Sequence, residues 1–163
     1  RHLMLSNVRG TFGGIKGTLV YDPADPSATQ VEATVDAATI STGDPKRDGH
    51  LKSADFLDVA QFPEIIFKAK RTEKTGDAEF NVTGDLTIHG VTHEVTLNVE
   101  DVSQEAKDPW GGTRIGATAK TKIDRQQFGV SWNSPLEIGG VMIGDEVKLE
   151  FDLQFTKVQA AGA

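Results

Sequence analysis

"EFNVTGDLTIHGVTHEVTLNVE", residues 79–100, is the stretch of sequence that decides the fold. Apolar and polar residues alternate along both halves of it, and one face of the first half carries Phe80, Val82, Leu86 and Ile88. Alternation with a period of two is typical of a strand that buries one face. The HGVT segment between the halves predicts a tight hairpin. The stretch therefore predicts two antiparallel strands with one dry face.

The same alternation continues in both directions from this hairpin. It is clearest in EVKLEFDLQF (146–155), and weaker runs occupy 8–22, 29–38, 64–73 and 113–123. Many of the resulting seven strands run about ten residues, or roughly 33 Å at 3.3 Å per residue. Strands in globular proteins usually have about five or six residues, so the sequence predicts an unusually tall sheet.

Seven long antiparallel strands do not close easily into a barrel. An up-and-down barrel favours an even number, because its first and last strands must pair antiparallel. We therefore expect an eighth strand ahead of RHLMLSNV, of which only the end is present. Eight strands would remove the exposed edges and leave an interior that either fills with side chains or holds one small ligand. The predicted fold is all-β, an eight-stranded antiparallel up-and-down barrel with short helices and loops at its mouth.

Composition and charge narrow the classes of function. The chain has 163 residues, a formal net charge of −7 and no cysteine. The acidic charge makes nucleic acid and anionic lipid surfaces unfavourable partners, and the lack of cysteine excludes disulfides and thiolate ligands. No apolar run approaches the roughly 20 residues of a membrane helix, and no signal peptide is visible. We expect one domain over residues 1–158 and a disordered tail over 159–163.

The predicted inward face contains several small residues, Ala33, Ala69, Ala117 and Ala119. Small inward residues in a long barrel either fit a taper, so that the core is filled, or leave an apolar cavity. An apolar ligand that buries about 400 Å² would gain roughly 10 kcal/mol at 25 cal/mol/Å², from which the cost of ordering is subtracted. The pattern leaves both interpretations open.

Two segments interrupt the strand pattern. Residues 43–58 predict a helical turn or two, from which Leu51, Phe56 and Leu57 cover an open end of the barrel, and residues 124–145 predict a long loop. Three aromatic residues lie in predicted loops, where they either cover the core or line an entrance: Trp110, Phe128 and Trp132.

The polar clusters give weak signals for chemistry. His89 and His93 flank the hairpin, and no carboxylate cluster completes a metal site with them. The three carboxylates within 55–64 have no nucleophile or oxyanion arrangement beside them, so we expect a solvated surface there. Asp124 and Arg125 predict a local cap and an ion pair.

Five stretches that span nearly the whole chain carry a resemblance when they are taken in order: RHLMLSNVRGTFGGIKGTLVYDP, TIST with KRDGHLKSADFLDVAQFPEIIF, GDLTIHGVTHEVTLNVE, WGGTRIGATAKTKIDRQQFGVSWN and GGVMIGDEVKLEFDLQF. As an ordered set they resemble the YceI-like family, also called polyisoprenoid-binding proteins. The resemblance implies a lipocalin-like barrel with a long hydrophobic tunnel. It also implies a bound isoprenoid quinone or other long-chain polyisoprenoid lipid, no required cofactor and no shared enzymatic activity.

The resemblance also concerns the beginning of the chain. The family opens with a strand of the form W-x-x-D-x-x-H-S-x-x-x-F-x-V, and RHL matches only its end, in agreement with the expected eighth strand. Members that show S-V-R-H-L-M at this point often lack a secretion signal, which favours a cytoplasmic over a periplasmic protein. Pairing into a homodimer through loops is compatible with the family.

We expect the ligand to contact the inward face and the aromatic lid, at Phe12, Ile15, Leu19, Val35, Phe56, Phe67, Phe80, Leu86, Ile88, Leu97, Ala117, Ala119, Phe128, Trp132, Leu149 and Phe151. The resemblance places KRDGHLKS near the barrel mouth. There Arg47, His50 and Lys52 either receive a polar head group or form an ion-paired loop that positions the helix. Two rival hypotheses stay open: an enzyme that uses the His50 region for acid–base chemistry on an apolar substrate, and a filled barrel that acts as a stress or interaction module.

Overall fold

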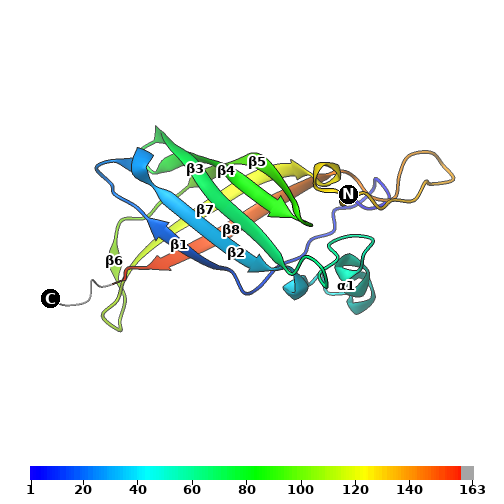
Figure 1. The fold of residues 1–163 in the computed structure, drawn as a ribbon, viewed down its shortest axis with the longest axis horizontal. Coiled ribbons are helices and arrows are strands. Elements are labelled where there is room, and N and C mark those ends of the chain that lie inside the picture. Colours follow the sequence, from blue (N-terminus) through cyan, green and yellow to red (C-terminus); the bar gives the residue numbers. More distant parts are fainter. Residues whose placement is uncertain (159–163) are drawn as a thin grey trace.

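The computed structural model describes residues 1–158 and folds them into one curled antiparallel sheet with a helical segment at one end (Figure 1). The predicted tail at 159–163 lies outside the described residues. The sheet has eight strands: β1 (Lys16–Val20), β2 (Gln30–Asp36), β3 (Glu64–Gly76), β4 (Glu79–Ile88), β5 (Val91–Glu100), β6 (Ala106–Lys107), β7 (Thr113–Asp124) and β8 (Glu146–Thr156). The helical elements are η1 (Pro26–Ala28), η2 (Ala37–Thr39), α1 (Pro45–Lys52) and η3 (Arg125–Phe128).

The strand order follows the chain, β1-β2-β3-β4-β5-β7, with β6 beside the start of β7 and β8 on its other edge. The seven predicted strands are confirmed, and the two-residue β6 is an addition that the alternation does not signal. Among residues 1–158 no ladder joins β1 to β8. The eight-stranded antiparallel sheet is confirmed, but its eighth strand is β6, since residues 1–15 form none of the strands, and the sheet is open between β1 and β8 over the described residues.

The hairpin between β4 and β5 has the expected two-residue turn. His89 and Gly90 both have positive φ, 53° and 70°, which is the requirement of a type I′ turn. Gly90 is also fixed by packing, because a Cβ atom there would lie 2.5 Å from Cε1 of Phe62. The turn sets the register of the ladder between β4 and β5, from Ile88 opposite Val91 to Phe80 opposite Val99.

The first strand is shorter than predicted. The alternation through 8–22 places Phe12 and Ile15 inward, but β1 begins only at Lys16, and the two side chains are 38% and 46% exposed. The reason is local: Gly14 has a φ of 64°, which ends the extended conformation before it reaches Ile15. The prediction that Phe12 and Ile15 face the interior from a strand is wrong.

A β-bulge changes which residues of β3 face the interior. Ala69 pairs with Gly84, but the next pairs are Arg71 with Thr83 and Thr72 with Val82, so Lys70 is an extra residue. A one-residue insertion moves every later side chain to the opposite face. Arg71 is therefore exposed and Thr72 is buried.

The end of the barrel next to α1 is filled. The buried core there includes Phe56, Leu86, Ile88, Phe128 and Val130. Asp44 caps α1 through its Oδ1, which accepts from the backbone N–H groups of residues 46 and 47. The sequence pattern predicts Phe56 on the helix. The helix ends at residue 52, however, so Phe56 comes from the turn that follows it.

Arg125 holds the long loop against this core. Its side chain is buried and donates to the carbonyl groups of Val130, Trp132, Ile143 and Gly144, and to Oδ1 of Asp145, over 2.7–3.3 Å. The expected ion pair is present, but four of the five partners are carbonyls. One guanidinium thus joins both ends of the loop.

We expect Arg125→Met to lower the free energy of unfolding by about 3 kcal/mol, because buried carbonyls lose charged donors. Urea unfolding followed by circular dichroism measures this loss. The matched control is Arg71→Met, which removes an exposed arginine whose ion pair with Glu94 is 3.3 Å long and which should lose less than about 1 kcal/mol. Equal losses in the two variants would contradict the role assigned to Arg125.

Candidate ligand-binding cavity

An apolar cavity of about 90 Å³ lies in the half of the barrel away from α1. It is enclosed where β2, β4 and β7 begin and where β1, β5 and β8 end, which is the end opposite the helix in Figure 1. The lining consists of Leu19, Tyr21, Thr29, Val31, Phe67, Thr72, Phe80, Val82, Leu97, Val99, Val102, Ile115, Gly116, Ala117, Ala119, Leu153 and Phe155. Apolar side chains with a few hydroxyl groups are the usual lining of a small-molecule site.

The space follows from short side chains on β7. Ala117 pairs with Leu153 of β8, and Ala119 pairs with Val99 of β5 and Phe151 of β8. Ala119 has no exposed surface. Two consecutive inward positions of a central strand therefore carry one methyl group each, where a larger residue would fill the interior.

The cavity opens toward the end of the barrel. A second hollow of about 260 Å³ adjoins it and shares Tyr21, Phe80, Val102 and Ile115 with its lining. The outer rim of this hollow is polar, with Asp77 and residues 103–105. An apolar molecule that enters the cavity from this end would pass a rim with acidic groups.

The side between β1 and β8 is lined by apolar side chains. Leu19 of β1 and both Leu153 and Phe155 of β8 line the same cavity, although the two strands share no ladder among the described residues.

Comparison with known proteins identifies the family. A model of the YceI-like domain matches residues 1–155. Protein YceI of Salmonella newport (strain SL254) is 41% identical over 131 residues, which are 80% of this chain and 68% of that protein. The chain belongs to the YceI-like family. The YceI protein of Campylobacter jejuni has the same fold with a TM-score of 0.81 and 30% identity, over 98% of this chain and 90% of that one.

A solved structure of much lower sequence identity supports the fold alone. The polyisoprenoid binding domain from Saccharophagus degradans superimposes with a TM-score of 0.61 at 15% identity, over 90% of this chain and 84% of that chain. The family resemblance and the lipocalin-like architecture predicted from the sequence are thus confirmed.

Six of the residues predicted to contact the ligand line the cavity of this YceI-like chain: Leu19, Phe67, Phe80, Leu97, Ala117 and Ala119. A second group belongs to the filled core beside α1: Phe56, Leu86, Ile88, Phe128, Trp132 and Leu149. Val35 and Phe151 are half-buried and lie outside the lining, and Phe12 and Ile15 are the two exposed residues before β1. The sequence pattern identified the inward face but not the point along the barrel at which the core ends.

The cavity has several lining residues that are absent from the predicted ligand contacts. Six of them are on the face that the alternation predicts to point inward: Val31, Val82, Val99, Ile115, Leu153 and Phe155. Tyr21, Thr29 and Val102 lie just beyond strand ends. Thr72 faces the interior only because of the bulge at Lys70, which no alternation signals.

The residues predicted to receive a polar head group lie at the wrong end of the barrel for this cavity. Arg47, His50 and Lys52 are on α1, at the filled end. Nε of Arg47 donates to Oγ1 of Thr42 at 2.8 Å, and Nε2 of His50 lies 2.7 Å from Oδ2 of Asp55. These contacts match the alternative given above, a polar loop that positions the helix.

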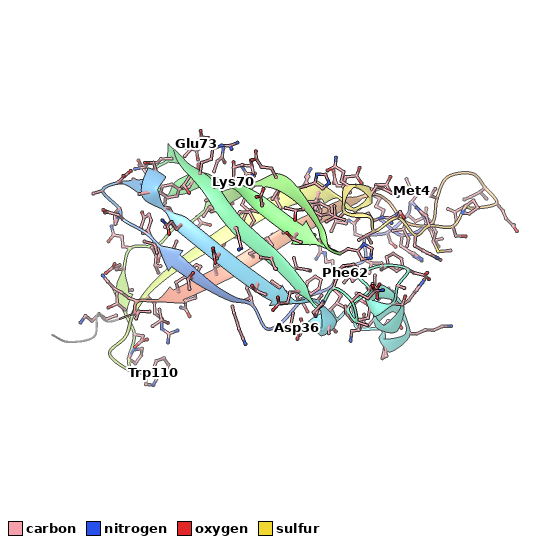
Figure 2. The ribbon with its side chains drawn as sticks, viewed as in Figure 1. Met4, Asp36, Phe62, Lys70, Glu73 and Trp110 are labelled. Carbon is pink, nitrogen blue, oxygen red and sulfur yellow. The ribbon has the colours of Figure 1, made fainter. Side chains whose placement is uncertain are left out.

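The aromatic residues of the loops have divided roles. The Trp132 ring lies 4.8 Å from the His50 ring and 5.4 Å from the Phe56 ring, so it covers the core. Trp110 is 84% exposed, and Figure 2 shows it at the end of the barrel opposite Phe62. It is therefore at the end that holds the cavity, but it is not in the lining.

Among residues 1–158, no three side chains of the His, Asp and Glu type come together as a metal site. Over the same residues, none of the helices has the length and hydrophobicity needed to span a bilayer. His89 and His93 instead pack on aromatic rings, with ring centroids 4.8 Å from Phe62 and 5.3 Å from Phe128.

The loop that carries Trp110 depends on one carboxylate. Oδ2 of Asp108 accepts from Nε of Arg114 at 2.6 Å, and its Oδ1 accepts from the backbone N–H groups of Trp110 and Gly112. The Arg114 guanidinium, and then the Gly112 N–H, lower the pKa of Asp108 below its usual 3.8. The loop of residues 108–112 is thus stabilised by the charged form of Asp108.

We expect this loop to open under acid. Because the pKa of Asp108 is lower in the folded protein, its stabilisation is complete above about pH 4 and is lost as the pH falls through the folded value. In a Trp132→Phe background, the fluorescence of Trp110 should change reversibly below about pH 4 while the circular dichroism of the sheet is retained. Asp108→Asn is the control and should show the open signal already at neutral pH. An identical acid transition in both variants would contradict this assignment.

Proposed function

We infer that this YceI-like barrel binds the apolar chain of an isoprenoid lipid and acts as a carrier or store and not as an enzyme. The observation that carries the proposal is the cavity in the half of the barrel away from α1, with its small side chains on β7 and its opening at the barrel end. A flexible, methyl-branched hydrocarbon is the ligand class that needs burial and few directional contacts.

The size of the cavity limits how such a lipid binds. A cavity volume of about 90 Å³ takes a short segment of a chain and not a long isoprenoid as a whole. The rest of the chain must continue through the adjoining hollow of about 260 Å³. If about 400 Å² of apolar surface is removed from water, the gross gain is roughly 10 kcal/mol, reduced by the ordering of the chain.

Two comparisons support this class of ligand. The chain belongs to the YceI-like family, and a structure with the same fold is described as a polyisoprenoid binding domain. Because that structure is only 15% identical, it supports the fold in which such a lipid binds, and the choice of ligand rests on the cavity of this chain.

The enzyme hypothesis has weaker support. His50 and Asp55 form the pair on which acid–base chemistry would depend, and both side chains are more than 40% exposed. The pair lies beside the filled core, with the His50 ring packed on Phe56 and Trp132. A general base must reach the proton that it abstracts, and an apolar substrate in the cavity would be at the other end of the barrel.

The direct test is native mass spectrometry of the purified protein, with organic extraction of whatever is bound. We expect a discrete added mass that is recovered as a prenyl lipid, or uptake of a prenyl lipid that is offered to the ligand-free protein. A protein that stays ligand-free in the presence of several prenyl lipids would contradict the proposal and favour the filled-barrel module.

A substitution in the cavity wall tests where the lipid binds. Ala117→Phe should abolish most lipid uptake, because the new ring occupies the enclosed volume while a half-buried position tolerates the larger side chain. Thr118→Phe is the matched control, since Thr118 is the next residue on β7 and is absent from the cavity lining. Lipid loading per folded protein, measured by native mass spectrometry, should fall only in the first variant. Equal loading in both would show that the lipid binds elsewhere.

A further inference from the structure

The Trp110 side chain is used neither by the core nor by the cavity. It is 84% exposed, although tryptophan is highly buried on average in folded proteins. The Arg114 guanidinium lies over the indole ring, with Cζ 6.0 Å from the ring centroid. A large apolar ring is therefore left in contact with solvent, beside one cationic group.

A defined turn keeps Trp110 in this exposed position. The backbone N–H of Asp108 donates to the carbonyl of Gly112 at 2.9 Å, and the N–H of Gly111 donates to the carbonyl of Asp108 at 3.2 Å. Gly111 has a φ of 86°, and a Cβ atom at Gly112 would lie 2.7 Å from Oδ2 of Asp108. Together with the bonds that the Asp108 carboxylate accepts, these contacts give the turn one conformation. The exposure of the indole is thus a property of the fold.

Trp110 shares its end of the barrel with the opening of the cavity (Figure 2). A second exposed apolar side chain lies at the same end: Val20 is 61% exposed, and its neighbours Leu19 and Tyr21 line the cavity. A surface that contacts Trp110 therefore lies at the end through which a lipid would enter.

The charges around this loop indicate which kind of surface fits. Nε of Arg114 lies 2.6 Å from Oδ2 of Asp108, and Nζ of Lys157 lies 2.9 Å from Oε1 of Glu105, so these groups already have partners. The net charge of −7 disfavours an anionic surface. An indole ring suits the head-group region of a bilayer, because its apolar body and its N–H both find partners there. The partner that fits is a lipid surface without net charge.

We propose that the cavity end of the barrel docks on a zwitterionic lipid bilayer through Trp110. The choice of a bilayer as the partner rests on the proposed function, because an isoprenoid lipid is taken from a membrane or delivered to one. Docking at this end lets the lipid chain pass between the bilayer and the cavity opening with little exposure to water.

The test measures partitioning onto phosphatidylcholine vesicles by co-sedimentation and by Trp110 fluorescence in Trp132→Phe. We expect the Trp110 emission to shift to shorter wavelength and to be quenched by phosphatidylcholine with brominated acyl chains. Trp110→Ser should lower the partition coefficient roughly tenfold, because the ring no longer leaves water. Ile138→Ser is the matched control: Ile138 is 89% exposed on the loop at the other end of the barrel, and its loss should leave partitioning unchanged. Replacement of part of the phosphatidylcholine by phosphatidylglycerol should weaken partitioning.

Three outcomes overturn the proposal: a wild-type protein that does not bind the vesicles, equal partitioning of Trp110→Ser and the wild type, and stronger binding to vesicles with phosphatidylglycerol. A loss in Ile138→Ser without a loss in Trp110→Ser also overturns it, since the opposite end would then dock. The failure of the proposed function is distinguishable. A protein that carries a prenyl lipid in native mass spectrometry but ignores the vesicles keeps its function and loses the docking surface, whereas one that binds the vesicles and takes up no prenyl lipid shows the reverse.

Discussion

The closed end of the barrel depends on the buried guanidinium of Arg125. It donates to four carbonyl groups and one carboxylate on both ends of the 129–145 loop. The Trp132 ring of this loop lies 5.4 Å from the ring of Phe56 in the turn after α1. Phe56, Phe128 and Val130 then fill this half of the interior. Because side chains fill the interior at this end, a ligand has room only at the other end. The packing of this core therefore determines where the cavity lies.

The other half of the interior contains the cavity. Ala117 and Ala119 have small side chains on the inner face of β7, and because of the bulge at Lys70 the inward residue of β3 is Thr72 and not Arg71. The wall between β1 and β8 consists of apolar side chains without a ladder in the described residues. Close packing in one half and an apolar space in the other suit the proposed binding of a lipid chain. The acidic rim of the opening agrees with a net charge of −7 and gives anionic surfaces no attraction.

The strands were predictable from the sequence, because a period-two pattern determines a half-buried strand wherever the backbone stays regular. Irregular backbone limited the prediction. Gly14 ends the extended run before Ile15 is reached, and the bulge at Lys70 reverses the faces of β3 beyond it. Alternation also places residues on the inner face without saying how far along the barrel the core is filled. The family resemblance, and not the alternation, predicts His50 at the barrel mouth, whereas the structure places it beside the filled core.

Photochemical labelling tests the central claim most directly, namely that the lipid chain lies in the half of the barrel away from α1. A prenyl lipid with a diazirine on its chain would be loaded, irradiated and mapped by peptide mass spectrometry. The account predicts labels on residues 115–119 of β7 and 153–155 of β8, which line the cavity. Labels confined to 45–62 and 128–132, around α1 and the filled core, would contradict it.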